Sequence, residues 1–176
     1  MDGIKVVVFG ASGKTGTCCT QAALNLGCEV TAFVRNPAKL PEELASQVTV
    51  KVGDVLEASS VDKAVQGQDA VVIVLGTGDN LTFSFRERTQ VPERFLPILD
   101  EHERMLQALK ASNLEWVAVL PPHITDEPGC GDYLKQHNSS PGRRVSKYDL
   151  GHFMVFCLSD DANLYQLCGI SDKPQL

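Results

Sequence analysis

The sequence contains no apolar run that approaches the roughly 18 residues of a membrane-spanning helix. It also has no excess of positive charge, since 16 lysines and arginines stand against 22 acidic residues and the formal net charge is -6. The basic residues are scattered except at Arg143 and Arg144, whereas nucleic-acid-binding proteins usually carry a basic stripe. We therefore expect a protein that binds neither membranes nor nucleic acid.

Patterns for metal ligation and for disulfides are missing as well. The six cysteines form no C-x-x-C pair, and no histidine stands near them at the spacing of a zinc site. Several lie among apolar residues, which favours buried, unreactive thiols in a reducing compartment. The N-terminus carries Asp2 and leads directly into a strand-like segment, unlike a signal peptide. We expect a cytoplasmic protein without a metal site.

The overall composition is that of an ordinary globular domain. The 176 residues are 43% hydrophobic and 22% charged, with 14 glycines and 9 prolines. A chain of this length buries about 70% of the surface that its unfolded form exposes, so its core needs neither disulfides nor metal. We predict one domain over residues 1–176.

The first half of the chain alternates between strand and helix patterns. Short apolar runs predict strands over 5–9, 29–34, 48–52 and 70–75, and apolar residues in helical period predict helices over 17–26 and 61–65. Continuous apolar strands separated by helices are typical of a parallel sheet that is covered on both faces. We predict an α/β fold with a Rossmann-like, doubly wound parallel sheet.

The second half has a less regular pattern. Residues 82–89 show no period and are predicted to form a loop. Apolar positions between 93 and 112 share one helical face, and residues 116–120 follow as a buried strand, which predicts a further crossover after the fourth strand. A polar loop over 125–142 and a last helix over 149–158 complete the prediction.

A glycine-punctuated loop joins the first predicted strand to the first predicted helix, and it reads Gly10-Ala11-Ser12-Gly13-Lys14-Thr15-Gly16. Dinucleotide-binding loops occupy this position. The first glycine permits a sharp turn, the second lets a pyrophosphate approach the backbone, and the third lets the helix pack on the sheet. The helix N-terminus adds N–H groups and partial positive charge. The loop therefore predicts a dinucleotide site.

Two alternatives to a dinucleotide loop remain open. The end of the motif, Gly13-Lys14-Thr15, matches the phosphate loop of nucleoside triphosphatases. The first glycine of that pattern would fall on Val8, inside the predicted strand, and Gly16 would have no role. The second alternative is a tight turn that binds nothing. We favour the dinucleotide loop, with Lys14 adding positive charge near the phosphates.

The end of the second predicted strand indicates which dinucleotide binds. NAD-selective folds carry an acidic residue there for the ribose hydroxyls, and this chain has Arg35. A guanidinium can pair with a 2′-phosphate through two hydrogen bonds, and Lys39 follows closely. We predict NADP (NADPH) as the cofactor; the alternative for Arg35 is a solvated loop charge.

Two later strands end in further candidate residues. Asp54 follows the third predicted strand and is predicted to contact the adenine edge. Gly76 and Thr77 follow the fourth and are predicted to line the cofactor groove. All of these positions follow the carboxyl ends of strands, where open parallel sheets bind ligands.

Longer blocks of the sequence resemble the biliverdin-IXβ reductase/flavin reductase family of atypical short-chain dehydrogenases/reductases. The blocks are VVVFGASGKTG, TAFVRNPAKLP, VGDVLEASSVDKAVQGQDAVVIVLGTGDNL, DEHERMLQALKASNLEWVAVLPPHI and RRVSKYDLGHFM. The resemblance implies hydride transfer from NADPH to flavins and linear tetrapyrroles. It implies NADP contacts at Gly10, Ser12, Gly13, Lys14, Thr15, Arg35, Lys39, Asp54, Val55, Leu75, Gly76 and Thr77, and it implies that Pro122, His123 and Ile124 lie near the nicotinamide.

The chain departs from that family in two places. The family has a longer segment after the fourth strand, which supplies a helix and a central strand ending in a serine that faces the nicotinamide. Here residues 82–88 stand in its place, and the residues after Leu158 also differ. We therefore predict a fold that lacks one helix-strand unit. We favour a structural loop role for Ser84; the alternative is that it is a remnant that substitutes for the missing serine.

Few side chains are needed for hydride transfer, because the cofactor carries the reaction. The Tyr-x-x-x-Lys pair of ordinary short-chain dehydrogenases is absent, since no tyrosine has a lysine four residues later. His123 follows two prolines at a strand end and is predicted to orient substrate or relay a proton, with a structural histidine as the alternative. Arg94 and Arg144 are predicted to bind a substrate's carboxylates or phosphate, with surface charges as the alternative.

Two hypotheses of function therefore follow from the sequence. The first is a monomeric NADPH-dependent reductase of flavins and biliverdin-IXβ. The second is a non-catalytic NADP-binding redox sensor or inactive variant, in which loss of the serine-bearing strand has opened the nicotinamide end of the site.

Overall fold

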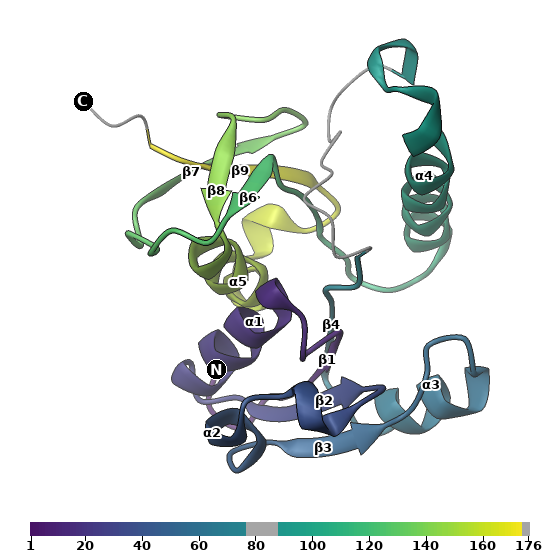
Figure 1. Cartoon of the computed structure of the whole chain (residues 1–176), viewed down its shortest axis with the longest axis vertical. Helices are drawn as coiled ribbons and strands as arrows, with labels where there is room; N and C mark the ends of the chain where they lie inside the picture. The colour runs from purple at the N-terminus through teal and green to yellow at the C-terminus, as the bar shows by residue number, and fades with distance from the viewer. Residues whose placement is uncertain (77–87, 174–176) are drawn as a thin grey trace. The chain divides into compact units, whose positions relative to one another are not determined.

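The structure is a computed structural model that describes residues 1–76 and 88–173. The chain divides into two compact units (Figure 1). The first comprises Met1–Asp79 and Lys147–Ser159, and the second comprises Asn80–Ser146 and Asp160–Leu176. The prediction of one domain over 1–176 stays a prediction.

A four-stranded parallel sheet organises the first unit. Its strands are β1 (Lys5–Phe9), β2 (Glu29–Val34), β3 (Thr49–Val52) and β4 (Ala70–Ile73), in the spatial order β3-β2-β1-β4. All three neighbouring pairs are parallel. With the first strand in the interior and helices in the connections, this is the arrangement of a Rossmann-like sheet. The predicted α/β fold class and all four predicted strands are confirmed.

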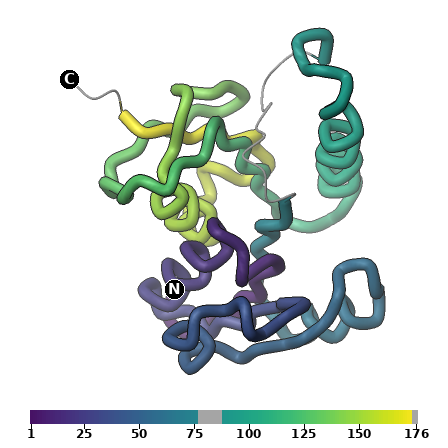
Figure 2. Tube along the Cα trace, viewed as in Figure 1, coloured from purple at the N-terminus to yellow at the C-terminus, as the bar shows by residue number. Residues whose placement is uncertain are grey.

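The helices of the first unit are α1 (Lys14–Asn25), α2 (Glu42–Ala45), α3 (Ala58–Val65) and α5 (Lys147–Phe156), with 3-10 turns η1 (Pro37–Lys39) and η4 (Cys157–Ser159). Helices α1 and α5 are far apart in the sequence but pack side by side in the structure (Figures 1 and 2). A Cβ atom at Gly151 of α5 would lie 2.7 Å from Cβ of Cys18, so the small residue permits this close packing.

Alternate residues of β1 and β2 point to opposite faces of the sheet, as strand geometry requires. Val6 and Val8 pack with Ala32 and with Cys19 of α1 in one cluster. On the other face Val7, Phe9 and Phe33 pack with Ala64 of α3, and the two phenylalanine rings lie 4.8 Å apart. Every apolar side chain of β1 is buried, which explains its continuous apolar run.

Strand β4 lies at the edge of this sheet and pairs only with β1 among the described residues. Val71 and Ile73, which share the α3 face, are each 43% exposed. In a doubly wound fold a further strand would follow beyond β4. The described part of the chain places no strand there, and the predicted loss of a helix-strand unit stays a prediction.

The second unit contains α4 (Leu96–Ala111), 3-10 turns η2 (Arg88–Gln90), η3 (Glu93–Phe95) and η5 (Asp161–Asn163), and five short strands. These strands are β5 (Ala118–Leu120), β6 (His123–Thr125), β7 (Tyr133–His137), β8 (Arg144–Ser146) and β9 (Leu167–Asp172). They form a three-stranded sheet in the order β5-β9-β7 and a two-stranded parallel sheet of β6 and β8. No helix in the described ranges is long and apolar enough to cross a membrane.

Two predictions for the second half were wrong. The segment 116–120 contains β5, but β5 pairs with β9 instead of extending the first sheet by a crossover. The polar loop predicted over 125–142 contains β7, which pairs antiparallel with β9. Both errors have one cause. Strand β9 lies about 30 to 50 residues away in the sequence, and no local pattern reveals such pairing.

A polar network links η5 to the β7-β9 pair. Asp160 precedes η5, and its carboxylate accepts hydrogen bonds from Nζ of Lys135 and from the side-chain amide of Asn163, both at 2.9 Å. Oδ1 of Asn163 lies 3.1 Å from Nε2 of His137 and 3.7 Å from Sγ of Cys168. This network attaches the C-terminal segment to β7.

Candidate functional site

The carboxyl ends of the four parallel strands lie together at one edge of the first unit's sheet. Phe9 is the register partner of both Phe33 and Ile73, and Val34 is the partner of Val52. The loops after these strands contain the glycine loop, Arg35, Asp54 and Leu75. The structure therefore brings together the predicted cofactor residues of this unit, at the edge where such sheets bind ligands.

Gly10 makes the turn off β1 that the sequence predicted. Its φ is +85°, which is in the left-handed region, and a Cβ there would lie 2.8 Å from the carbonyl oxygen of Val74 after β4. The N–H of Gly13 then donates to the carbonyl of Gly10 at 2.9 Å and closes the loop. No other residue fits Gly10 without moving the backbone.

Helix α1 begins at Lys14, with Gly13 as its N-cap residue. The N–H groups of Thr15 and Gly16 lie in the first turn, where the helix itself supplies no acceptor. The first turn has no acidic side chain to neutralise the positive end of the helix dipole. Gly13 is exposed and Ser12 and Thr15 are half-buried, so the loop surrounds a surface that a phosphate can reach.

The phosphate-loop alternative requires a glycine at the position of Val8. That residue is fully buried and lies within β1, paired with Ala32 on one side and with Val72 on the other. It cannot form part of a loop around a triphosphate. The geometry thus favours the dinucleotide interpretation of the loop.

Arg35 and Lys39 both follow β2 and are both exposed. Lys39 ends the 3-10 turn η1, which Asn36 caps by accepting a hydrogen bond from the N–H of Ala38 at 3.0 Å. Within the described ranges the guanidinium of Arg35 has no ion pair and no hydrogen bond. Both cations are accessible to a ligand anion at the carboxyl end of β2.

The remaining cofactor candidates follow β3 and β4. Asp54 is half-buried, and its Oδ1 accepts a hydrogen bond from the N–H of Leu56 at 3.0 Å, which holds the turn after β3. Val55 and Leu75 are 37% and 49% exposed, and Gly76 is exposed next to Leu75. Thr77 and Ser84 lie outside the described residues.

The second unit brings together two other predicted residues. His123 of β6 is the register partner of Arg144 of β8, and its N–H donates to the carbonyl of Arg143 at 3.3 Å. Both side chains are exposed, whereas Pro122 before them is buried and Ile124 after His123 is half-buried. The predicted catalytic histidine and one predicted substrate-binding arginine are therefore neighbours on one small sheet.

Arg144 has acidic neighbours that the sequence analysis did not identify. Its Nη1 lies 3.5 Å from a carboxylate oxygen of Glu127, and its Nε lies 3.7 Å from one of Asp172. The other carboxylate oxygen of Asp172 accepts a hydrogen bond from the N–H of Ser146 at 2.9 Å. A substrate anion at Arg144 would share the guanidinium with these two carboxylates. No local sequence signal links them, because Asp172 is 28 residues beyond Arg144.

Arg94 lies apart from this pair. It belongs to η3, and its guanidinium carbon lies 4.6 Å from the centre of the Phe95 ring. No described contact joins it to His123 or Arg144. The structure therefore gives its predicted substrate role no direct support.

No group of three or more metal-ligating side chains is found in ranges 1–76 and 88–173. All six cysteines are free thiols, and Cys130 alone among them is exposed. Burial raises the pKa of Cys19 to about 12, with a smaller contribution from the neighbouring thiol of Cys18. Burial likewise raises the pKa of Cys168. Neither buried thiol forms a thiolate near neutral pH.

Comparison of the sequence with known protein families agrees with this geometry. The family described as NAD(P)H-binding matches residues 10–91 and 82–161, which include the glycine loop and the β6-β8 pair. The chain belongs to the NAD(P)H-binding Rossmann-fold family. The loop needs its glycines for its own packing, because a Cβ atom at Gly10 or Gly16 would collide with backbone and one at Gly13 would crowd the backbone of Gly10.

Solved structures show the same fold at low sequence identity. A Rossmann-fold NAD(P)-binding family protein from Shigella flexneri is 23% identical with a TM-score of 0.76, and the match covers 98% of each chain. A "putative NAD-dependent epimerase/dehydratase" from Bacillus halodurans is 20% identical with a TM-score of 0.83, covering 98% of this chain and 96% of that one. A "putative NADH-flavin reductase" from Streptococcus pneumoniae is 21% identical with a TM-score of 0.66, covering 97% and 100%.

Proposed function

We propose that this NAD(P)H-binding protein is an NADPH-dependent reductase that transfers hydride to flavins and to linear tetrapyrroles such as biliverdin-IXβ, as a cytoplasmic monomer. One observation supports it above the others: the guanidinium of Arg35, which has no ion pair or hydrogen bond with another described residue, follows β2 at the same sheet edge as the glycine loop. An arginine there suits the 2′-phosphate that distinguishes NADPH from NADH. The "putative NADH-flavin reductase" among the similar structures supports flavin as the acceptor, although the cofactor named for that protein is NADH.

The residues of the first unit would hold the cofactor. The loop from Gly10 to Gly16 would receive the pyrophosphate at the α1 N-terminus, and Lys14 would add positive charge. Arg35 and Lys39 would bind the 2′-phosphate, and Asp54 would contact the adenine edge. Val55, Leu75 and Gly76 would line the groove, as would Thr77 outside the described residues.

The residues of the second unit would serve the acceptor. When bound, NADPH supplies the hydride. Reduction of a flavin or of a tetrapyrrole also takes up a proton, and the His123 side chain is the proposed proton relay. Arg144, its neighbour across the β6-β8 pair, would bind a carboxylate or phosphate of the acceptor, with Arg94 as a second cation. Pro122 and Ile124 would lie beside the nicotinamide.

A second candidate function is that of a non-catalytic NADP-binding sensor or inactive variant. The position of β4 favours it, because no described strand extends the sheet beyond β4, where the related reductases are expected to carry their serine. In that case cofactor binding would remain and the acceptor would not be reduced.

Thermal unfolding with and without NADP+ tests the cofactor site first. A ligand that binds the native state at 100 times its Kd stabilises it by about 2.7 kcal/mol, so the melting temperature should rise. NADPH oxidation with flavin mononucleotide and with biliverdin-IXβ then separates the two candidates. Turnover of an acceptor would support the reductase, and NADP+ binding without turnover would support the non-catalytic candidate. A melting temperature that NADP+ does not change would contradict both.

A further inference from the structure

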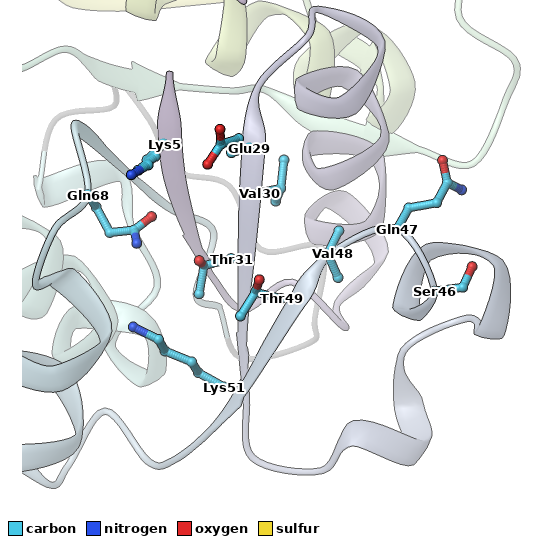
Figure 3. Close-up of a pocket in the computed structure, with 10 residues that line it drawn as sticks. All are labelled: Lys5, Glu29, Val30, Thr31, Ser46, Gln47, Val48, Thr49, Lys51 and Gln68. Carbon is cyan, nitrogen blue, oxygen red and sulfur yellow. The ribbon is translucent and has the colours of Figure 1, made fainter. Parts of the chain in front are cut away.

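The polar pocket at the amino-terminal edge of the first unit's sheet lies away from the proposed cofactor residues (Figure 3). It has a volume of about 550 Å³, and Lys5, Lys51 and Glu29 are among the residues that line it. Oδ2 of Asp69 accepts a hydrogen bond from the backbone N–H of Lys5 at 2.8 Å, so a second carboxylate lies beside the pocket. Two lysines against two carboxylates leave no net charge, and the pocket therefore favours an ion of neither sign.

A cluster of charged side chains in the second unit lies beside the predicted catalytic histidine. Arg144 of β8 is the register partner of His123 of β6 (Figure 1). Nη1 of its guanidinium lies 3.5 Å from a carboxylate oxygen of Glu127, and Nε lies 3.7 Å from one of Asp172. Both distances exceed the roughly 2.7 to 3.2 Å of an N–H···O hydrogen bond. The opposite charges attract, but they leave the donors and acceptors of this cluster unused.

Buried Ser146 holds both carboxylate-bearing segments in place. Its Oγ donates a hydrogen bond to the main-chain carbonyl of Glu127 at 2.7 Å, and its N–H donates to the carboxylate of Asp172 at 2.9 Å. Ser146 is 1% exposed and lies two residues after Arg144 in the same strand. The three charged residues therefore share one rigid support.

The hydrogen-bonding groups of this cluster are accessible. A guanidinium has five N–H donors, and no described residue forms a hydrogen bond with those of Arg144 or with the carboxylate of Glu127. The two side chains are 44% and 57% exposed, whereas that of Asp172 is only 17% exposed. A ligand at this surface thus meets a row of donors on Arg144 with an acceptor on Glu127 next to it.

An anionic group alone does not match this pair. Its oxygen atoms would accept from Arg144, but they would also face the carboxylates of Glu127 and Asp172, and like charges repel. A neutral group in which a carbonyl stands next to an N–H matches both partners, because the carbonyl accepts from the guanidinium and the N–H donates to Glu127. Lactams and cyclic imides have this arrangement.

We propose that Glu127 accepts a hydrogen bond from the N–H of a lactam or cyclic imide on the acceptor, while Arg144 donates to the adjacent carbonyl oxygen. The inference rests on the proposed function, which assigns the acceptor to the His123–Arg144 pair. Flavins carry an imide N–H between two carbonyls, and linear tetrapyrroles end in lactam rings, so one edge serves both acceptors. The remaining N–H groups of Arg144 stay available to a carboxylate or phosphate elsewhere on the acceptor. Glu127 determines specificity and takes no part in hydride transfer.

Two flavins test the chemical class of the ligand. Lumiflavin has neither phosphate nor carboxylate, and 3-methyllumiflavin differs from it only by a methyl group in place of the imide hydrogen. Binding of each is followed by quenching of flavin fluorescence at saturating NADP+. We expect lumiflavin to bind about tenfold more tightly, because a site built around a hydrogen bond rejects the analogue that lacks the donor. Equal affinity for the two flavins, or a failure of lumiflavin to bind, would overturn the proposal.

Variants of Glu127 separate the hydrogen bond from the added bulk of the methyl group. Glu127→Met keeps the length of the side chain but removes the acceptor, so it should weaken lumiflavin binding about tenfold and leave 3-methyllumiflavin binding unchanged. Glu127→Gln keeps an acceptor oxygen and should retain most of the preference. Both variants should fold, because Ser146 bonds to the main chain at position 127 and not to the side chain. A preference that persists in Glu127→Met would contradict the assignment.

Glu115→Met is the matched control. It removes the same charge from an exposed position of the second unit and should change neither affinity. NADPH oxidation with lumiflavin separates this inference from the proposed function. A preference in binding without turnover would support the recognition of the N–H and contradict the reductase. Turnover of both flavins with equal KM would support the reductase and contradict the role of Glu127.

Discussion

A Cβ atom at Gly16 would lie 2.0 Å from the carbonyl oxygen of Gly10. The third glycine of the loop therefore lies directly against the backbone of the first, and this contact seats the first turn of α1 on the sheet. Backbone atoms cannot rotate away from such an overlap as a flexible side chain can. The same carbonyl accepts the hydrogen bond of Gly13, so the packing and the loop closure depend on one peptide group.

Gly16→Ala should destabilise the protein by about 1 to 3 kcal/mol or more, because overpacking at a backbone contact shifts α1. It should also abolish NADP+ binding. Chemical unfolding and isothermal titration measure the two effects. Gly67→Ala is the matched control, since its φ is +74° but nothing lies within 4 Å of its Cβ position. We expect it to cost about 1 kcal/mol for backbone strain alone and to leave binding intact.

Arg35→Ala should raise the Kd for NADPH by roughly 10-fold to 150-fold, the range that a lost hydrogen bond to a charged group of about 1.5 to 3 kcal/mol implies. The Kd for NADH should stay the same, because NADH has no 2′-phosphate. Lys39→Ala should have a smaller effect in the same direction. If Arg35→Ala left NADPH affinity untouched, the assignment of the 2′-phosphate contact would be wrong.

Acid should weaken the network at Asp160. The hydrogen bond from the Lys135 ammonium lowers the pKa of Asp160, with support from the N–H of Ala162. The unfolded chain then binds more protons at low pH, so this contribution to stability is complete above about pH 5 and is lost as pH falls through about 4 and below. Asp160→Asn should lower the urea midpoint at pH 7. The midpoint of this variant should also decrease less than that of the unchanged protein as the pH is lowered. Asp161→Asn, at the exposed neighbour, should do neither.

Thiol labelling should distinguish Cys130 from the buried cysteines. A pKa of about 12 leaves roughly one Cys19 side chain in ten thousand as thiolate at pH 8, and burial blocks the reagent as well. Ellman's reagent should therefore label one thiol rapidly in the native protein and six in denaturant. Cys130→Ser should remove the rapid phase, and a rapid phase that survives would mean that a buried thiol becomes accessible.

The first unit was predictable because its signals are local. The apolar runs of β1 and β2 are buried on both faces, and the glycine loop lies directly between β1 and α1 in the sequence. The second unit was not, because its strands are three to six residues long and pair over long sequence distances. Strand β9 illustrates this point. A Cβ at its Gly169 would lie 2.0 Å from the carbonyl oxygen of Ser139, so the glycine serves a close approach of two backbones, which sequence alone cannot reveal.

The acidic neighbours of Arg144 escaped prediction for a related reason. Glu127 and Asp172 come from separate segments that only the folded chain brings to Arg144. The pairing of His123 with Arg144, by contrast, joins two residues that were predicted separately, and the structure supplies the link between them.

Helix α4 has no buried residue along its 16 positions. An isolated helix of this length is marginal in water, since most helical stability comes from tertiary packing. Its backbone amides should therefore exchange with deuterium far faster than those of β1, whose side chains fill the core of the first unit. The molecule would then open in stages, with α4 unravelling while the parallel sheet and its glycine loop stay folded.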